Sequence, residues 1–441
     1  MTQFRRTLTG FQAFVLSLAI IAPTLAMAFN VSLSVQAAGQ AAPLAFLVGG
    51  AAMGLIGLSF VAFSRRIASA GSAQAYVGAV FGRRWGFVAG WGLLLAYLAF
   101  LASATSLIGG FLAVGLAHLG LSHPWLWLAI ALSGGTLVIV LGGREIRQAT
   151  AVMLAIEVAA VLAIVVLAGV ILASVPLTAE PFWPDPARGL SGLGFGMVFA
   201  VLSLAGFEGA ATVAEETSDP HRAIPRAILG SLIAATLLYA LVSYAQVLGY
   251  GRMGIEALGT APAPLDTLSE RYLSRSYGIF LDLAAGVSSL ACALGTATAA
   301  ARILYALGGA GLGGRFAEID PAHGAPRTAI RFVGGLNLLL LIVFGSFAGS
   351  RAFSEACATT ATLVLILVYV AVGLAQGVLA ARERRWGWSV TGFAGSLLLA
   401  WPLLNSLYPP PAWPGPLWPL LVLAWMGAGL ALVRRATPRK A

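Results

Sequence analysis

Several polar side chains stand inside long apolar runs of this chain, where their chemistry is proton transfer or cation binding. Glu157 lies within Ala155–Ala159, Glu208 lies two residues after Gly206, and Ser288-Ser289 interrupt a run rich in alanine and glycine. A charge at the centre of a membrane-spanning helix costs roughly 2.5–3.5 kcal/mol on insertion scales, so such residues are functional hypotheses by default. Asp282 begins a later apolar run, and we expect it to be solvated or to cap a helix.

Two of the apolar runs are interrupted near their middle. The first reads Leu18-Ala19-Ile20-Ile21-Ala22-Pro23-Thr24-Leu25-Ala26, and the second reads Leu202-Ser203-Leu204-Ala205-Gly206-Phe207-Glu208-Gly209. In hydrocarbon each unpaired backbone group costs several kcal/mol, so a broken helix survives only where it is buried or lines a cavity. Paired interruptions in two halves of a chain point to a transport site near the membrane midplane. The pattern predicts a secondary transporter.

The breaks also predict how a ligand binds. The half-helix after Pro23 presents free N–H groups and a positive dipole end, which suit a carboxylate. Since Pro23 itself has no N–H, we expect the following amides and the Thr24 hydroxyl to bind the anion, and carbonyls released at Gly206 to receive an α-ammonium. A simple kink at Pro23 is the alternative. The predicted substrate-binding residues are Ile21, Ala22, Thr24, Leu25, Ala26, Leu202, Ser203, Ala205 and Gly206.

Energy coupling has several candidates. Glu157 is either a proton carrier or cation ligand, because burial favours the protonated form of a carboxyl group, or a hydrogen-bonded core residue. For Glu208 we favour a structural role, in which its carboxylate accepts hydrogen bonds from amides that the second break leaves free. Pro23 is the structural residue of the first break. Ser288 and Ser289 form either a cation site or, as we favour, a packing surface. Coupling to H⁺ or to Na⁺ both stay open, with H⁺ preferred.

Composition places the chain in a membrane. Of its 441 residues 59% are hydrophobic and 10% are charged, with a mean hydropathy of +0.91, whereas soluble domains carry about 25% charged residues. The net charge of +10 does not indicate a nucleic-acid partner, because the basic residues form short clusters between apolar runs. We expect a lipid bilayer and a small-molecule amino acid as partners. The oligomeric state is left open.

Runs of about 20 apolar residues can each cross a bilayer as a helix. We count twelve, near 11–34, 43–63, 85–112, 125–141, 149–175, 192–214, 226–250, 276–307, 328–348, 353–379, 388–407 and 414–433, with an amphipathic connector at 64–84. With the N-terminus inside, 21 basic residues fall in cytoplasmic segments and 5 in outer ones, which predicts a multi-pass protein of the cytoplasmic membrane with both termini cytoplasmic. Arg5-Arg6 and Ala26-Met27-Ala28 imitate a signal peptide, but cleavage would leave eleven runs and spoil this alternation.

Three stretches resemble one family of membrane proteins. Gly206–Ala211 with Ala214–Pro220 and Ile224–Ile228 looks like the sixth helix and following loop of the amino acid–polyamine–organocation superfamily. Ala300–Leu307 is similar to its eighth helix, and Ala70–Val77 to its second loop. The resemblance implies an all-α membrane fold of twelve transmembrane helices, with a five-plus-five inverted repeat in which helices 1 and 6 are broken. The first repeat would span 1–175, the second 192–379, and helices 11 and 12 with a cytoplasmic tail 388–441.

The chain departs from the family pattern at three places. Ala22-Pro23-Thr24 replaces a frequent Gly-x-Gly step, Leu202 replaces a frequent aromatic gate, and Glu157 stands where proton-coupled members often have a lysine. The resemblance implies an amino acid permease that works by alternating access, as a proton-coupled symporter or an exchanger. Because no charged partner except Glu208 lies near the breaks, we prefer a neutral or small apolar substrate. The alternatives are a polyamine, cationic amino acid or other organic-amine transporter, and a non-transporting channel or sensor.

Other chemistry finds no support in the sequence. Gly309–Gly314 matches GxGxxG but follows no strand, and no GxxxxGK phosphate-binding motif occurs. The four histidines and two cysteines show no metal-ligand spacing. We therefore expect no enzyme, no metal site and no cofactor other than the coupled H⁺ or Na⁺.

Overall fold

The computed structural model describes residues 9–67, 69, 71–142, 147–212, 216–320, 325–408 and 413–435. Within these residues the chain is helical, with one isolated bridge between Asp320 and Ala325 and no β-strand, so the predicted all-α class is confirmed. Among the described residues, nine segments are long and apolar enough to cross a membrane, and α7 and α19 are shorter apolar helices. The described part of each of the twelve predicted runs lies mainly in one or more helical elements. Twelve crossings and the two-repeat division stay predictions.

The first half of the chain contains both long helices and short helical turns. In order they are α1 (Gly10–Ile21), α2 (Pro23–Leu25), η1 (Ala26–Asn30), α3 (Val31–Ala38), η2 (Gly39–Ala41), α4 (Ala42–Ser64), α5 (Ala73–Phe81), α6 (Arg83–Ala117), α7 (Leu126–Gly142), α8 (Arg147–Ser174), η3 (Glu180–Phe182), α9 (Gly189–Leu204) and α10 (Gly209–Thr212). Here η1 is a π-helical turn, and η2 and η3 are 3₁₀ turns. The predicted connector 64–84 contains α5, which packs on α6 and α17.

The second half continues in the same way. Its helices are α11 (Pro220–Tyr250), η5 (Gly251–Met253), α12 (Ile255–Thr260), α13 (Pro264–Tyr272), α14 (Arg275–Leu307), η6 (Gly308–Leu312), η7 (Gly314–Ala317), α15 (Arg327–Leu340), η8 (Leu341–Gly345), α16 (Ser346–Ala348), α17 (Ser350–Arg382), α18 (Trp386–Leu407) and α19 (Leu417–Arg435). Local signals start several of them: the Ser274 hydroxyl accepts the Tyr277 N–H at 3.3 Å at the start of α14.

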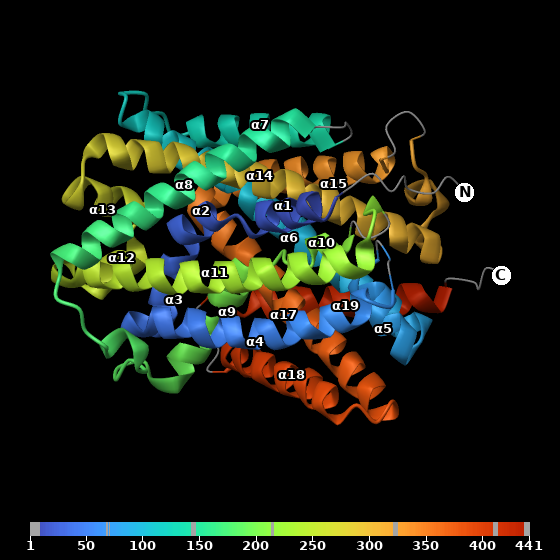
Figure 1. Cartoon of the computed structure of the whole chain (residues 1–441). Coiled ribbons are helices and arrows are strands. Elements are labelled where there is room, and N and C mark those ends of the chain that lie inside the picture. The colour runs from blue at the N-terminus through green and yellow to red at the C-terminus, as the bar shows by residue number, and fades with distance from the viewer. Residues whose placement is uncertain are drawn as a thin grey trace.

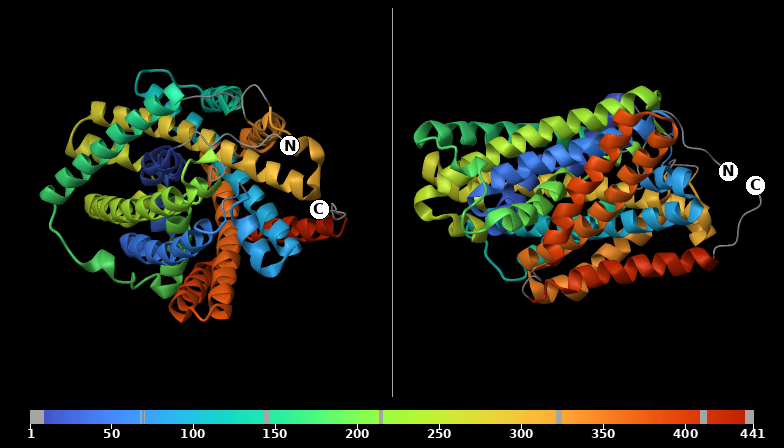
Figure 2. Two further views of the ribbon diagram at one scale, coloured as in Figure 1. Left: turned by 45° about the vertical axis from the view of Figure 1, so that its right-hand side comes forward. Right: turned by 90° about the horizontal axis from the view of Figure 1, so that it is seen from below.

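The long helices lie side by side along one axis (Figures 1 and 2). The helices α6, α14 and α17 form the centre, since α6 packs against both of the others along its length. One end of the bundle, here called the termini face, carries the start of α1 and the ends of α4, α14 and α17 (right in Figure 1). The opposite end, the α13 face, carries α12, α13 and the start of α14 at Arg275.

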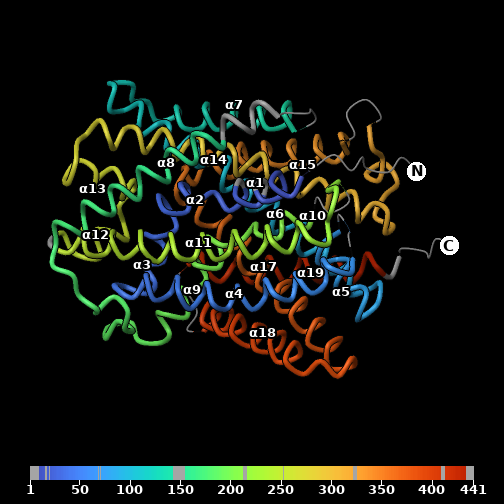
Figure 3. The backbone as a smooth tube through the Cα atoms, viewed as in Figure 1, coloured from blue at the N-terminus to red at the C-terminus, as the bar shows by residue number. Residues whose placement is uncertain are grey.

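The two helices predicted to be broken are broken in the structure. Figure 3 shows α1 and α2, and α9 and α10, as separate coils between the two ends of the bundle. Both breaks are buried within one continuous apolar core that includes Ile21, Ala22, Leu202 and Phe207. The fold therefore brings together two interruptions that lie about 180 residues apart in the sequence.

Candidate functional site

The first break is centred on Ala22. This residue is buried and has φ 45° and ψ 70°, a left-handed conformation that costs a residue with a Cβ about 1–2 kcal/mol. Pro23 explains why α1 ends here, because a proline disfavours right-handed helical geometry in the residue before it and has no N–H to continue the helix. The helix resumes at Pro23, so the predicted break and its cause are both present.

The amides after Pro23 are already bound by side chains of the protein. The Thr24 N–H donates to Glu157 Oε1 at 2.8 Å, and the Leu25 N–H donates to Ser288 Oγ at 3.3 Å. The Ala26 N–H closes onto the Ala22 carbonyl at 2.9 Å. The N–H groups at the start of this half-helix therefore bind a side chain of the protein, the carboxyl group of Glu157.

Glu157 faces the bundle interior from α8. Only 5% of the residue is exposed, whereas its neighbour Val158 is 48% exposed. The hydroxyl groups of Thr24 and Ser288 also lie beside the carboxylate, and Tyr239 of α11 lies near it. The sequence predicts that Glu157 lies inside an apolar helix. It does not predict the contact with the first break, because Thr24 and Glu157 are 133 positions apart.

The second break lies between Leu204 and Gly209. Ala205 is extended, with φ −62° and ψ 145°, and Gly206 has φ 104°. A Cβ at Gly206 would overlap the Ile20 side chain, so a glycine is required both by the backbone conformation and by the close approach of α1. The Leu202 carbonyl, one of those expected to receive an α-ammonium, accepts the Ala205 N–H at 3.1 Å, and the ammonium site stays a prediction.

Glu208 binds groups of the second break. Its carboxylate accepts the Tyr97 hydroxyl at 3.0 Å and the Gly206 N–H at 3.1 Å, and it is fully buried. Ser17 of α1 completes the arrangement: its hydroxyl donates to the Phe207 carbonyl at 2.9 Å and accepts the Ala210 N–H at 3.0 Å. This geometry agrees with the structural role favoured for Glu208. Sequence reasoning missed Ser17 and Tyr97, which carry no local signal.

The two serines of α14 have different partners. Ser288 contacts the first break, but the Ser289 hydroxyl donates to the Ala285 carbonyl of its own helix at 2.7 Å. The pair therefore does not act as one unit toward α1 in this structure. Between the breaks, the Asn30 side-chain amide donates to Ser203 Oγ at 2.9 Å, so the hydroxyl of a predicted site residue links α9 to η1.

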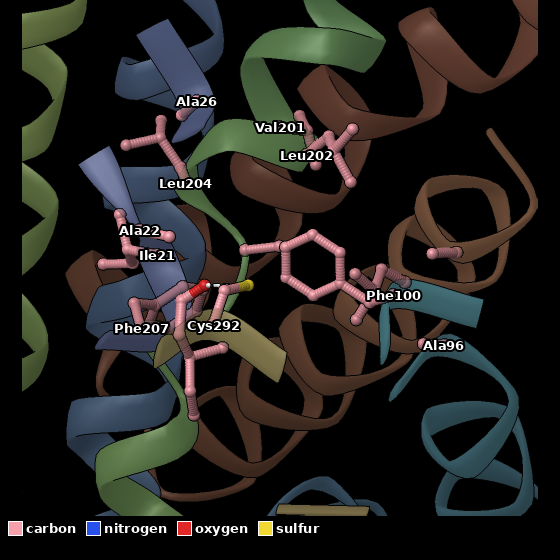
Figure 4. Close-up of a cluster of buried hydrophobic side chains, with 14 of the residues drawn as sticks. Ile21, Ala22, Ala26, Ala96, Phe100, Val201, Leu202, Leu204, Phe207 and Cys292 are labelled. Carbon is pink, nitrogen blue, oxygen red and sulfur yellow. Dashed lines mark hydrogen bonds between the residues drawn. The ribbon is translucent and has the colours of Figure 1, made fainter. Parts of the chain in front are cut away.

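Apolar side chains surround the two breaks (Figure 4). They come from α1, α6, η1, the α9 break and α14, and almost all are less than 9% exposed. The labelled members are Ile21, Ala22, Ala26, Ala96, Phe100, Val201, Leu202, Leu204, Phe207 and Cys292. The Cys292 thiol donates to the Ile20 carbonyl at 3.3 Å. A ligand between the breaks would meet mainly hydrocarbon with backbone polar groups at its edge.

Both ends of this site are covered. On the termini face, Arg302 of α14 forms a bidentate ion pair with Glu216, with N–O distances of 2.6 and 3.0 Å and side chains only 13% and 15% exposed. On the α13 face, α13 contacts η1, α8, α11 and α14. The structure is thus an occluded one, with the breaks shielded from both ends.

Comparison with known proteins identifies the family. The profile of the family described as "Amino acid permease" matches residues 8–431, which is nearly the whole chain. The chain belongs to the amino acid permease family. It is therefore a transporter and not an enzyme, and the predicted superfamily is confirmed.

The individual relatives have low sequence identity to this chain but align with most of its length. The branched-chain amino acid permease BcaP of Lactococcus lactis is 26% identical over 407 residues, covering 83% of each protein. The cationic amino acid transporter 4 of Mus musculus is 26% identical over 333 residues, covering 69% of this chain and 50% of that protein. The crystal structure of MhsT in complex with L-phenylalanine superposes with a TM-score of 0.65 at 16% identity, over 99% of this chain and 100% of that one. The permease thus shares its fold with this solved structure.

Proposed function

We propose that this permease carries an apolar amino acid of about branched-chain size. The α-carboxylate of this substrate binds the backbone N–H groups of the half-helix after Pro23. The observation that carries the proposal is the Glu157 carboxylate on the Thr24 N–H at 2.8 Å, because it marks this amide as an anion site within the protein. The hydrocarbon lining around the breaks suits an apolar side chain. The branched-chain permease of Lactococcus lactis among the relatives supports the same choice.

Coupling follows from competition for one amide. A substrate carboxylate that takes the Thr24 N–H must displace the Glu157 carboxylate, which is then a buried anion without its best donor. Binding a proton from the water-exposed side neutralises the displaced carboxylate, so the substrate and the proton enter together. We therefore prefer H⁺ over Na⁺ symport. The Ser289 hydroxyl, which bonds to its own helix, adds no support for a sodium site.

We further propose that the termini face is cytoplasmic in a cytoplasmic (inner) membrane. The clusters around Arg66 and Arg382–Arg385 lie on this face, as positive-inside orientation requires. The Arg302–Glu216 ion pair then closes the inner side and α13 covers the outer side. Alternating access would open these covers in turn.

Uptake by the purified protein in proteoliposomes, with and without an inward pH gradient, tests this function. We expect gradient-driven uptake of leucine, isoleucine or valine, and little competition by arginine or putrescine. Leucine methyl ester should not compete, because it lacks the carboxylate that binds the Thr24 amide. Equal competition by the ester would refute the carboxylate site, and preferential uptake of arginine or putrescine would refute the apolar substrate class.

Thr24→Val refines the same test. The change deletes a buried hydroxyl beside Glu157 but keeps the backbone N–H and the side-chain shape. We expect a higher KM with normal expression. Thr298→Val is the matched control, since the Thr298 hydroxyl donates to the Leu294 carbonyl of its own helix at 2.7 Å.

A further inference from the structure

Polar side chains from three elements meet on the α13 face, away from the two breaks. His118 directly follows α6, Asp266 and Glu270 lie one turn apart on α13, and His118 Nε2 lies 3.2 Å from Asp266 Oδ2. One ligand atom from each of His118, Asp266 and Glu270 can be chosen so that all three lie within 4.8 Å of one another. One nitrogen and two carboxylate oxygens at such spacing are a donor set for a transition-metal ion.

A fourth carboxylate supplies an independent reason to place a cation here. Asp282 on α14 is only 2% exposed, and its Oδ2 makes no hydrogen bond. The expectation that Asp282 is solvated or capping is wrong: Ser274 caps α14, and Asp282 lies two turns further in. The charges of Asp266 and Glu270 act on it electrostatically, so Asp282 lies close to the cluster.

One oxygen of Asp266 also lacks a partner. Its Oδ1 is buried without a hydrogen bond, and it packs so closely on Gly278 that a side chain there would overlap it. Gly278 lies one turn before Asp282 on α14, so two carboxylate oxygens without a hydrogen bond lie beside the same stretch of this helix. A bound cation would supply the missing partner.

We propose that His118, Asp266 and Glu270, backed by Asp282, form a binding site for a divalent transition-metal ion such as Zn²⁺. Zinc bonds of about 2.0–2.2 Å place any two ligand atoms no more than about 4 Å apart, so the side chains need to close by about 1 Å. The partly exposed positions of His118 and Asp266 and the exposed position of Glu270 give the ion a path from the water.

Binding requires one rearrangement around His118. Arg275 now donates to His118 Nδ1 from Nε at 3.3 Å, so the imidazole proton lies on Nε2 and points to Asp266. When the metal takes Nε2, that proton moves to Nδ1 and the imidazole stays neutral. Arg275 must then leave both His118 Nδ1 and the carboxylate of Glu270, whose Oε1 lies 3.8 Å from Arg275 Nε; the Arg275 side chain is 64% exposed and can turn into water.

The site would act on the cover of the transport pathway. It joins α13 to the end of α6 and to α14, and α13 contacts η1, the turn that follows the first break and α2 in the chain. An ion held here fixes α13 in the position that it has in the occluded structure. Resting on the proposed transport function, this predicts that Zn²⁺ inhibits uptake when added on the α13 face.

Cobalt and zinc titrations of the full-length purified protein test the site without reference to transport. Wild type should bind Co²⁺ in a saturable way, with the visible absorption bands of a low-symmetry nitrogen–oxygen site, and Zn²⁺ should displace it and raise the midpoint of heat unfolding. His118→Gln and Glu270→Gln should each weaken binding by at least about tenfold. His123→Gln is the control, since His123 is exposed in the same loop but is not part of the cluster.

Two results would overturn the site: no saturable Co²⁺ binding by wild type, or equal binding by wild type and the Glu270→Gln variant. Glu270 is exposed, so this variant is expected to fold, and a monodisperse elution profile checks that. In proteoliposomes, Zn²⁺ should inhibit wild type and the His123→Gln variant but not the Glu270→Gln variant. Intact Co²⁺ binding with no amino acid uptake would count against the permease proposal and leave the metal site standing.

Discussion

Ser17→Ala should destabilise the protein, because a single hydroxyl satisfies two backbone groups of the second break. Ser17 Oγ donates to the Phe207 carbonyl at 2.9 Å and accepts the Ala210 N–H at 3.0 Å, and the serine is fully buried. Leaving a buried donor or acceptor without a partner costs about 1–3 kcal/mol. Two such groups give a free-energy loss of about 2–6 kcal/mol, above that of a buried serine whose hydroxyl bonds only within its own helix.

The assay is heat unfolding in detergent, followed by the loss of the monodisperse peak. Ser243→Ala is the matched control: Ser243 is also fully buried, but its hydroxyl donates only to carbonyls of its own helix, Tyr239 at 2.6 Å and Ala240 at 3.2 Å. We expect the Ser17 variant to unfold several degrees below wild type and the control to stay close to wild type. Equal midpoints for the two variants would show that water or movement satisfies the break, and would refute the reasoning.

Two further variants test the covers and the packing of the breaks. Arg302→Ala removes one partner of the Arg302–Glu216 ion pair, whose side chains are 13% and 15% exposed. An exposed pair contributes about 0–1 kcal/mol and breaking a buried pair costs about 3–5 kcal/mol, so we take about 2 kcal/mol for this partly buried pair. The maleimide reactivity of Cys292 should then rise about thirtyfold in a Cys357→Ser background; unchanged reactivity would mean that the pair does not hold the termini face closed. Gly206→Ala should lose both stability and uptake, because φ at Gly206 is 104° and a Cβ there would overlap Ile20. Gly189→Ala is the control, with φ 59° and open space around the glycine, and should lose only a little stability. Similar losses in the two variants would assign the effect to backbone strain alone.

The helices and their breaks could be predicted well from the sequence, because both depend on local signals. Hydrophobic runs set the helices, and Pro23 and Gly206 impose backbone conformations that a continuous helix cannot adopt. Residues 213–215, which follow α10 in the chain, lie outside the described residues. The predicted loop motif at Ala214–Pro220 is therefore described only from residue 216 onward.

Partners across the bundle could not be predicted. Glu157 was recognised as a buried acid, but its bond to Thr24 depends on the packing of α8 against α2. The position of Asp282 near the start of an apolar run predicts an exposed side chain. The side chain is buried instead, in the part of the bundle where α13 packs against α14. His118 and Asp266 lie 148 positions apart, so no sequence spacing indicates their pairing.

The central claim is that Glu157 gives up the Thr24 amide to the substrate carboxylate and takes a proton in exchange. Glu157→Gln keeps the shape and an acceptor for the Thr24 N–H but fixes the neutral form. In proteoliposomes we predict that this variant loses accumulation driven by a pH gradient and retains exchange of internal for external substrate, because exchange needs only the loaded carrier to reorient. Accumulation against a gradient with unchanged pH dependence would contradict the account, and Ser288 with Ser289 would become the better candidate for coupling.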